Sequence, residues 1–540
     1  MLKIMLTAFV LPLLLLFAPT DVQSGGKNPA NTEDGSGTLQ KMIVASGSAT
    51  MEIDLHRLNR TSSRTEELKM TSSDMLSALR FAVARALKGE TGSEAPTLVH
   101  GPDVIVGDIP DMAQFGTAGT QVGLGMATDA CNNGDQPINW FALPNPDHPV
   151  VPQNLYRMSG GGDNTTRFEQ IGQSWMKHTF GADESNSCGF GCNTNACSQG
   201  VQLCPGCSDL YFASTNADQG SIGSRAWVNP FTGVFQSSAN NHSGHSHNGA
   251  SHRVRVNVDD LNTTLNAGAT YFAEAQYITP HEYSWCQSHP GECNMFNNAS
   301  YRQFIVSGIS NFTFSPAGPT QRMQPAIMAW TGATVNQVQP DPGNDGIWFM
   351  GYKVTNPTPG VYHYEYAVYN QNLDRGIQSF SVPLGAGANL SNIGFHVPPQ
   401  EPGWANDGTF NNQGYSSMPW VVTQASDSIT WNSETFAQNQ NANAIRWGTL
   451  YNFRFDADQP PQSANATIGF FKTGSPITVA IQAPAGGVTP TPTPTLTPTP
   501  TATATATATA TPNASPTPRP SPTPRTGPSP RPRQTPPPRP

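Results

Sequence analysis

Turn-forming residues divide this chain into short apolar runs, and this division limits the structures that it can form. Its 540 residues include 50 glycines and 49 prolines, and only 12% of them are Asp, Glu, Lys or Arg. Helices favour Ala, Leu, Glu and Lys, whereas a mixture rich in Gly, Pro, Asn, Ser and Thr favours strands joined by turns. We therefore expect a mainly β protein, and the length predicts two or three domains.

The first 24 residues (1–24) have the form of a secretory signal peptide. Lys3 precedes an apolar run from Leu6 to Ala18, and small polar residues follow it. The run is short and contains Pro12, so a cleaved signal is favoured over a retained anchor. No other stretch approaches the ~20 apolar residues of a membrane span. We expect a secreted or cell-surface protein without a transmembrane span, in which a disordered segment (25–40) follows the signal.

The cysteines agree with export. Cys286 and Cys293 bracket the sequence QSHPGE and predict a local disulfide. The spacing leaves open how the other six pair. These six are Cys131, Cys188, Cys192, Cys197, Cys204 and Cys207. Disulfides are the expected state in an exported chain, whereas in a reducing compartment the thiolates of CGFGC and CPGC would have the spacing of zinc ligands.

The segment 41–308 is predicted to be an N-terminal, cysteine-containing, β-rich domain. Alternating apolar residues in TMEIDLHRLN (50–59) predict a strand, and helical spacing of leucines and valine predicts a helix over 73–89. The sequence RFEQIGQSWMKHTF (167–180) is interpreted as a second helix, because its apolar residues fall on one helical face. After His252, valines alternate with polar residues, which predicts a strand. The stretches ATYFAEAQYIT and SYRQFIVSG continue the strand pattern up to Gly308.

The segment 309–485 is predicted to be a C-terminal β-sandwich of immunoglobulin-like form, since short strands follow one another at sandwich-like spacing. In one of them Tyr362, Tyr364 and Tyr366 share a face. That face is either one layer of the sandwich core or an exposed platform that stacks sugars. The expected fold is thus two β-sandwich-like domains with one or two short helices in the N-terminal part.

The last segment (486–540) is a Pro/Thr-rich tract that cannot bury a core, and we expect it to form a disordered, semi-rigid stalk. It carries five arginines and no acids, whereas the whole chain has a net charge of −9. An acidic body argues against a nucleic-acid partner. The basic tip either contacts anionic cell-envelope polymers or only keeps the stalk solvated. Envelope polymers and glycans are the partners that we expect.

Several catalytic signatures are absent from the sequence. It has no GxSxG elbow, no GxxxxGK[ST] phosphate loop and no CxxCH haem motif. His281 and Glu282 begin like a zinc-protease helix, but Trp285 occupies the place of the second histidine. In DPGNDG, Asp341 and Asp345 suggest either a calcium turn or an ordinary tight turn.

A histidine cluster is the best candidate for chemistry. The stretch NNHSGHSHNGASH contains His242, His245, His247 and His252. On a strand, His245 and His247 would face one side and hold one metal, and neutral imidazole favours copper or zinc. The surrounding serines, glycines and asparagines also fit a polar loop with no metal.

Four stretches resemble a group of large secreted bacterial proteins to which no activity is assigned. They are HPVVPQNLYRM, RFEQIGQSWMKH, YHYEYAVYNQNLDR and AIRWGTLYNFRFDADQPP, and the resemblance extends over residues 42–482. It implies export and leaves the activity open.

A second, local resemblance concerns HSHNGASHRV. It is similar to the His-x-His copper strand of the peptidylglycine and dopamine monooxygenases, which pair two β-sandwich domains. This resemblance implies that His245 and His247 are copper ligands, with Met323 or Met328 as a soft third ligand. The chain lacks the adjacent His-His pair that would hold a second copper.

The function that we expect from these observations is binding or surface architecture by a secreted or cell-surface protein, with no identifiable catalytic motif. The alternative is a secreted copper-dependent oxidoreductase that uses the cluster between His242 and His252. No catalytic residue is assigned.

Overall fold

The computed structural model describes residues 41–46, 49–54, 97–159, 167–179, 181–235 and 246–484. The predicted signal peptide, the segment 25–40, the helix over 73–89 and the Pro/Thr-rich stalk lie outside these ranges. At the start, β1 (Lys41–Ser46) and β2 (Ala49–Asp54) form an antiparallel hairpin, so the strand predicted from TMEIDLHRLN is present. The mainly β prediction is confirmed.

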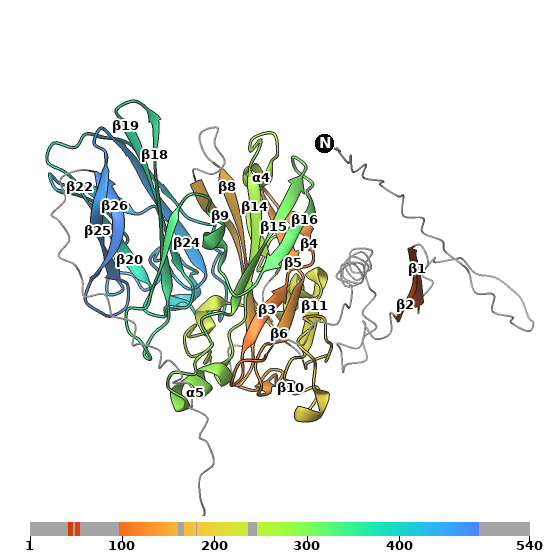
Figure 1. Cartoon of the computed structure of the whole chain (residues 1–540). Coiled ribbons are helices and arrows are strands. Elements are labelled where there is room, and N and C mark those ends of the chain that lie inside the picture. The colour runs from red at the N-terminus through yellow and green to blue at the C-terminus, as the bar shows by residue number, and fades with distance from the viewer. Residues whose placement is uncertain are drawn as a thin grey trace, which may run out of the picture. The chain divides into compact units, whose positions relative to one another are not determined.

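The N-terminal half is organised around a nine-stranded antiparallel sheet (Figure 1). Its order is β16-β15-β14-β8-β9-β13-β5-β4, and β12 pairs with β9 beside this path. The strands are β4 (Met112–Ala118), β5 (Gln121–Met126), β8 (Val150–Ser159), β9 (Arg167–His178), β12 (Ile222–Gly223), β13 (Val254–Asn257), β14 (Thr270–Gln276), β15 (Ala299–Ser307) and β16 (Thr313–Gln321).

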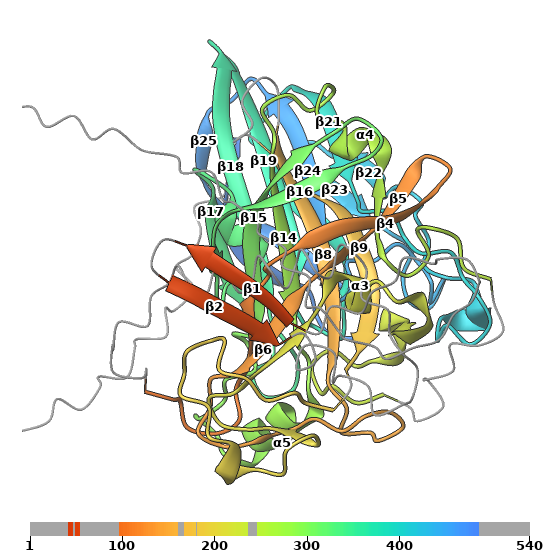
Figure 2. The same ribbon diagram turned by 90° about the vertical axis from the view of Figure 1, so that its right-hand side faces the viewer.

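Two small sheets and short helices accompany the large sheet. One small sheet has the order β11-β6-β3, and the other pairs β10 with β7. Their strands are β3 (Val104–Asp108), β6 (Thr128–Asn132), β7 (Ile138–Asn139), β10 (Gln202–Leu203) and β11 (Ser208–Tyr211). The described α-helices are α3 (Ala213–Asn216), α4 (Val258–Leu261) and α5 (Pro280–Ser288), and α5 lies at the lower end of this half in Figures 1 and 2. None of the helices in the described ranges is long and apolar enough to cross a bilayer.

The C-terminal half is a sandwich of two five-stranded antiparallel sheets. One sheet has the order β17-β18-β19-β24-β21 and the other β22-β23-β20-β25-β26. The strands are β17 (Thr334–Val338), β18 (Trp348–Thr358), β19 (Val361–Asn370), β20 (Ile377–Pro383), β21 (Leu390–His396), β22 (Val421–Gln424), β23 (Ser428–Asn432), β24 (Thr449–Ala457), β25 (Pro461–Phe470) and β26 (Ile477–Pro484).

The tyrosine face of β19 belongs to the core of this sandwich. Tyr364 and Tyr366 are fully buried and pack with Phe380, Phe453 and other aromatic rings between the sheets. Their hydroxyls donate to the carbonyls of Gln459 at 2.8 Å and Gln482 at 2.7 Å. The core interpretation therefore holds for both, and neither ring is available to stack a sugar.

The helix predicted over 167–180 is wrong, because this segment is strand β9. Phe168, Ile171 and Trp175 have a spacing that fits one face of a helix. However, β9 lies inside the large sheet between β8 and β13, and nearly all of its residues are buried. A strand that is covered on both faces does not need alternating polarity, so its apolar spacing can match a helical period by chance.

The predicted boundary at residue 308 falls within the β15–β16 hairpin. β16 pairs with β15, so the chain leaves the first sheet only after Gln321. Contacts place both halves in one compact unit. Whether 41–308 and 309–485 fold as separate domains stays a prediction.

An apolar layer joins the two halves. Phe168 of β9 and Tyr156 of β8 pack in one buried cluster with Tyr369 of β19 and Leu450 of β24. β24 faces β9 across this junction (Figure 1). Two charged side chains, Arg225 and Glu274, are buried beside the layer.

Arg225 ties the halves together through its guanidinium. In the N-terminal half it donates to the carbonyls of Ser174 at 2.7 Å and Gln153 at 3.1 Å, and to the side chain of Asn154 at 2.8 Å. In the C-terminal half it donates to the carbonyls of Trp447 and Gly448, both at 3.2 Å. Burial lowers the pKa of Arg225 to about 10, and these acceptors keep the buried cation satisfied.

Glu274 is the acceptor in a second set of bonds across the junction. Its Oε1 accepts from the side chains of Asn154 at 2.9 Å, Tyr156 at 2.8 Å and Tyr369 at 2.9 Å. Its Oε2 accepts from the amide of Ala326 at 2.6 Å. Burial raises the pKa of Glu274, although the hydrogen bonds oppose that shift. Since Tyr369 and Ala326 come from outside the first sheet, this carboxyl also fixes the junction.

Replacement of Arg225 by Met should destabilise the protein by about 3 kcal/mol or more, because it leaves several buried carbonyls without a donor. Lys472→Met is the control. Lys472 pairs with Asp374 at 2.8 Å, but the two side chains are 36% and 28% exposed, so its loss should cost less than about 1 kcal/mol. Urea denaturation measures both changes, and equal losses would contradict the role given to Arg225.

Candidate functional site

The structure brings together two of the four predicted histidine ligands. His252 is buried with a left-handed backbone (φ 63°), and the centroid of the His247 ring lies 4.8 Å from that of His252. Burial lowers the pKa of His247, so its imidazole is neutral over a wider pH range, as a ligand must be. His242 and His245 lie outside the described residues. The metal site therefore stays a prediction.

His252 belongs to an aromatic cluster that the sequence analysis did not identify. Its ring stacks on Trp175, with centroids 4.5 Å apart, and on Trp404, with centroids 5.4 Å apart. Trp175 and Trp404 also stack on each other at 5.5 Å, and Trp227 meets Trp404 edge-on at 6.1 Å. All three tryptophans are half-buried, so part of each remains open to solvent. We call Trp175, Trp227, Trp404 and His252 the tryptophan cluster.

Different elements position the members of the cluster. Trp175 comes from β9, Trp227 ends the 3-10 helix η3 (Arg225–Trp227), and Trp404 lies in the loop after β21. The indole N–H of Trp227 donates to the carbonyl of Asn406 at 2.8 Å. Gly408 has φ 78°, and a Cβ there would lie 2.5 Å from the Trp227 ring. The loop can approach the indole only because this position is glycine.

A cavity of about 270 Å³ lies beside the cluster, at the junction of the two halves. β9 and η3 contribute Trp175 and Arg225 to its wall. The C-terminal half contributes the aromatic residues Phe410, Tyr415, Phe436 and Trp447 and the polar residues Asp374, Glu401, Gln440, Asn441, Arg446 and Lys472. A concave site with aromatic walls and a few polar groups at a junction is the usual form of a small-ligand site.

Arg446 differs from the other charged groups of the cavity. Glu401 binds Arg255 at 2.8 Å, and Lys472 binds Asp374. The guanidinium of Arg446 lies 3.8 Å from the ring centroid of Tyr415, and its Nη2 donates to the Gln440 carbonyl at 2.8 Å. Its Nη2 also donates to the Ala442 carbonyl at 3.2 Å. Among the described residues no carboxylate forms an ion pair with Arg446, so its positive charge can attract an anionic ligand.

A pair of buried histidines lies at the end of β9. His148 Nδ1 is 2.8 Å from the Phe141 carbonyl, so this nitrogen carries the proton, and His148 Nε2 accepts from His178 Nδ1 at 3.0 Å. Burial lowers the pKa of His148 to about 4. These hydrogen bonds give His148 a structural role. His178 is buried at the end of strand β9.

Two buried carboxylates flank Arg167. Its Nε lies 3.5 Å from Glu169 and 3.4 Å from Glu365. His363 bridges Glu365 at 3.1 Å and Asp456 at 2.6 Å. A carboxylate pair can catalyse hydrolysis, but the side chains of Glu169 and Glu365 are only 5% and 0% exposed. We assign this group to structure rather than to catalysis, since substrate cannot reach it.

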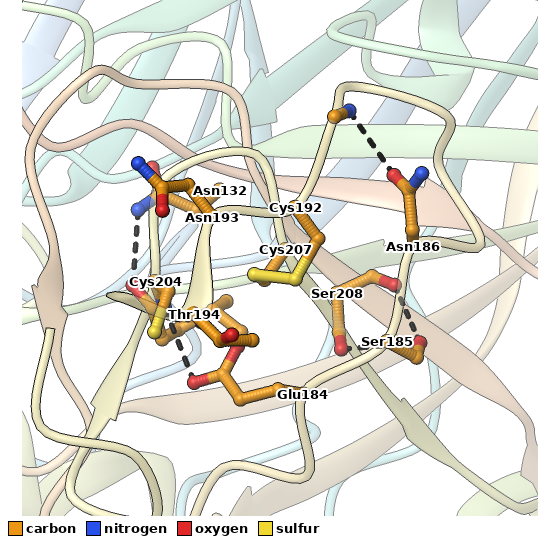
Figure 3. The surroundings of a disulfide bond; sticks show 12 residues. Asn132, Glu184, Ser185, Asn186, Cys192, Asn193, Thr194, Cys204, Cys207 and Ser208 are labelled. Carbon is orange, nitrogen blue, oxygen red and sulfur yellow. Dashed lines mark hydrogen bonds between the residues drawn. A yellow bond between two sulfur atoms is a disulfide. The ribbon is translucent and has the colours of Figure 1, made fainter. Parts of the chain in front are cut away.

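The cysteines are all paired in disulfides. The predicted Cys286–Cys293 bond is present. The other bonds join Cys131 to Cys188, Cys192 to Cys207, and Cys197 to Cys204, so the last two are nested in the sequence. Figure 3 shows the Cys192–Cys207 bond with Cys204 beside it. In the described part of the chain the metal-like groupings of His, Cys, Asp and Glu both contain disulfide cysteines. Those sulfurs carry no thiolate for zinc.

The weaker sequence signals have structural explanations. Asp341 and Asp345 both bind Arg375 at 2.7 Å, which makes this an ordinary turn closed by a cation. Glu282 is buried and accepts from the Val104 amide at 2.6 Å.

Met323 follows β16, whereas His252 precedes β13, five strands away in the sheet. At about 4.8 Å per strand, Met323 is too distant to share a metal with His252.

Comparisons with known proteins give no family. No family model and no curated protein matches the chain. Among solved structures, the exo-beta-D-glucosaminidase CsxA, described for its inhibition by a glucosamine-configured castanospermine and an amino-australine analogue, is similar at 9% sequence identity and a TM-score of 0.13. The match covers 67% of this chain and 25% of that one. So weak a likeness carries no argument about fold or activity.

The group around His363 should make stability depend on pH. Burial lowers the pKa of His363, but hydrogen bonds and charges from Glu365 and Asp456 outweigh it, so the pKa is raised above 6.5. The resulting stabilisation is complete below about pH 6.5 and is lost as the pH rises through the raised value. The difference in unfolding free energy between wild type and His363→Gln should therefore be largest in acid and fall towards alkaline pH. A difference that is constant from about pH 5 to about pH 9 would contradict this assignment.

Proposed function

We propose that this chain is an exported binding protein whose ligand occupies the junction cavity and packs against the tryptophan cluster. The observation that carries the proposal is the position of Trp175, a half-buried residue that lines a cavity of about 270 Å³ and stacks on Trp404 and His252. An indole that is held by stacking but still partly open to solvent gives a flat apolar surface at small entropic cost. Four disulfides agree with an oxidising compartment outside the cytosol.

Binding is favoured over catalysis because the two carboxyl groups in the cavity wall, Glu401 and Asp374, are each paired with a cation. Glu401 is neutralised by Arg255 and Asp374 by Lys472. The five hydrogen bonds of Arg225 already engage its three nitrogens. What the wall offers to a ligand is aromatic surface, the side-chain amide of Gln440, and Arg446.

The ligand class that fits this wall is a glycan. Sugar rings have an apolar face that packs on indoles and hydroxyls that bond to amides and guanidinium groups. The positive charge of Arg446, which lines the cavity and has no carboxylate partner among the described residues, favours a sugar that carries a carboxylate. Glycans with uronic or sialic acid residues are therefore the first ligands to screen against the full chain.

Trp175→Ala should weaken glycan affinity by at least tenfold, about 1.4 kcal/mol, because Trp175 lines the cavity and a tryptophan that anchors a ligand is commonly a hot spot. Trp285→Ala is the matched control. Trp285 is also half-buried and stacked on a histidine, His289 at 3.6 Å, but it does not line the cavity. A glycan array followed by calorimetry provides the measurement. Absence of any glycan ligand, or equal effects of the two variants, would overturn the proposal.

A copper-dependent oxidoreductase is the second candidate, and the adjacency of His247 and His252 supports it. If this candidate is right, protein that is purified without a histidine tag should retain about one copper or zinc ion per chain after dialysis. Mass spectrometry measures the metal content. His247→Ala should abolish that stoichiometry, whereas His289→Ala should leave it unchanged. Protein that retains no metal would reject this candidate and leave His247 as part of a polar loop.

A further inference from the structure

Two disulfides lie side by side in the nested segment that contains CGFGC and CPGC. Cys192–Cys207 encloses Cys197–Cys204 in the sequence. The Sγ atoms of Cys204 and Cys207 and a carboxylate oxygen of Glu184 all lie within 4.8 Å of one another. A sulfur of one bond is therefore within a short movement of a sulfur of the other.

The backbone between these two cysteines is already folded for a direct bond. The amide of Cys207 donates to the Cys204 carbonyl at 3.0 Å, and Gly206 has φ 70°. With Pro205 before Gly206, this is the pattern of a type II turn, which holds its end Cα atoms less than about 7 Å apart. A disulfide spans Cα separations of about 4.4–6.8 Å. The alternative Cys204–Cys207 bond thus needs little change in the chain.

The four cysteines of the nested disulfides differ in their exposure to solvent. Cys192 and Cys197 are half-buried on the solvent side, whereas Cys204 and Cys207 are fully buried. A thiolate from solvent can reach Cys197, and the sulfur that it displaces, Cys204, is held inside beside Cys207. The first reduction therefore leaves the buried thiolate next to a second disulfide.

Glu184 lies where it can assist this displacement. Its Oε1 is 3.9 Å from Cys197 Sγ, and its carboxylate accepts from the Cys204 amide at 3.3 Å (Figure 3). Burial raises the pKa of Glu184 to about 7, and the nearby charge of Asp183 adds to the rise. Near neutral pH a large fraction of this carboxyl group is protonated and can stabilise a departing thiolate.

We propose that the nested disulfides and Glu184 form a thiol–disulfide exchange site that reacts with an external dithiol. One thiolate of the dithiol attacks Cys197 Sγ and breaks the Cys197–Cys204 bond. The Cys204 thiolate then attacks Cys207 Sγ, so the Cys204–Cys207 bond forms and Cys192 is released as a thiol. The second thiol of the reagent closes its own disulfide and releases Cys197. Two electrons and two protons pass from the dithiol, and Cys192 and Cys197 become thiols.

The experiment is limited reduction of the full chain with dithiothreitol, alkylation and disulfide mapping by mass spectrometry. Cys286–Cys293 is an internal control, since it closes the same sequence separation of 7 residues as Cys197–Cys204. We expect alkylation at Cys192 and Cys197 with a retained Cys204–Cys207 bond, at least tenfold faster than alkylation at Cys286. Alkylation at Cys197 and Cys204 with Cys192–Cys207 intact would overturn the proposal, and so would equal rates of reduction for Cys197–Cys204 and Cys286–Cys293.

Glu184→Gln tests the carboxyl group in the same assay. Ionisation of dithiothreitol changes the alkylation rates at Cys197 and Cys286 by the same factor. The ratio of the two rates is therefore independent of the ionisation of the reagent. In the wild type this ratio should fall as the pH rises through about 7, because the protonated Glu184 is lost. In Glu184→Gln it should stay flat. A ratio with the same pH profile in both proteins would remove Glu184 from the site.

Discussion

The buried guanidinium of Arg225 is the contact on which the arrangement of the two halves depends. A cation taken out of water is costly unless polar atoms surround it. Here the atoms that surround it are mostly backbone carbonyls, two from the N-terminal half and two from the loop before β24. Carbonyls of the backbone cannot turn away as side chains can. The bonds of Arg225 therefore fix where the loop before β24 lies against β8 and β9.

This constraint also accounts for the position of the cavity. The interior of the sandwich is filled by aromatic rings and leaves no room for a ligand. At the junction, in contrast, curved sheets meet through loops, and loops cannot pack as evenly as strands do. Arg225 lies in the cavity wall, and its neighbour Trp227 belongs to the tryptophan cluster. The same short helix, η3, thus joins the halves and positions one face of the candidate site.

The sandwich was predictable from the sequence because strands such as β23 and β26, in its outer sheet, have one face in the core and a more exposed opposite face. The alternating burial of their residues follows directly from that geometry. The prediction from apolar spacing failed for β9, because both faces of this strand are covered and its residues do not alternate in polarity. The local Cys286–Cys293 bond was predictable from spacing, but the nested pairs depend on the turn at Pro205 and Gly206.

The candidate site was mostly invisible in the sequence for a related reason. Trp175, Trp227 and Trp404 are single residues far apart in the chain, and Arg225 and Arg446 carry no motif around them. Only the fold brings them together. Of the residues that the sequence identified, His252 lies in this site, where its ring stacks on the indoles of Trp175 and Trp404.

The position of His252 bears on both candidate functions. Stacking covers the faces of an imidazole, whereas metal ligands approach in the plane of the ring through its nitrogens. The contacts with Trp175 and Trp404 therefore fix the ring orientation of His252 without excluding a metal, in the way that outer contacts commonly orient ligands. Loss of Trp175 would disturb a sugar platform and a metal ligand alike. Loss of His247, which stands outside the stack, would affect only the metal, so His247 is the residue that separates the two functions.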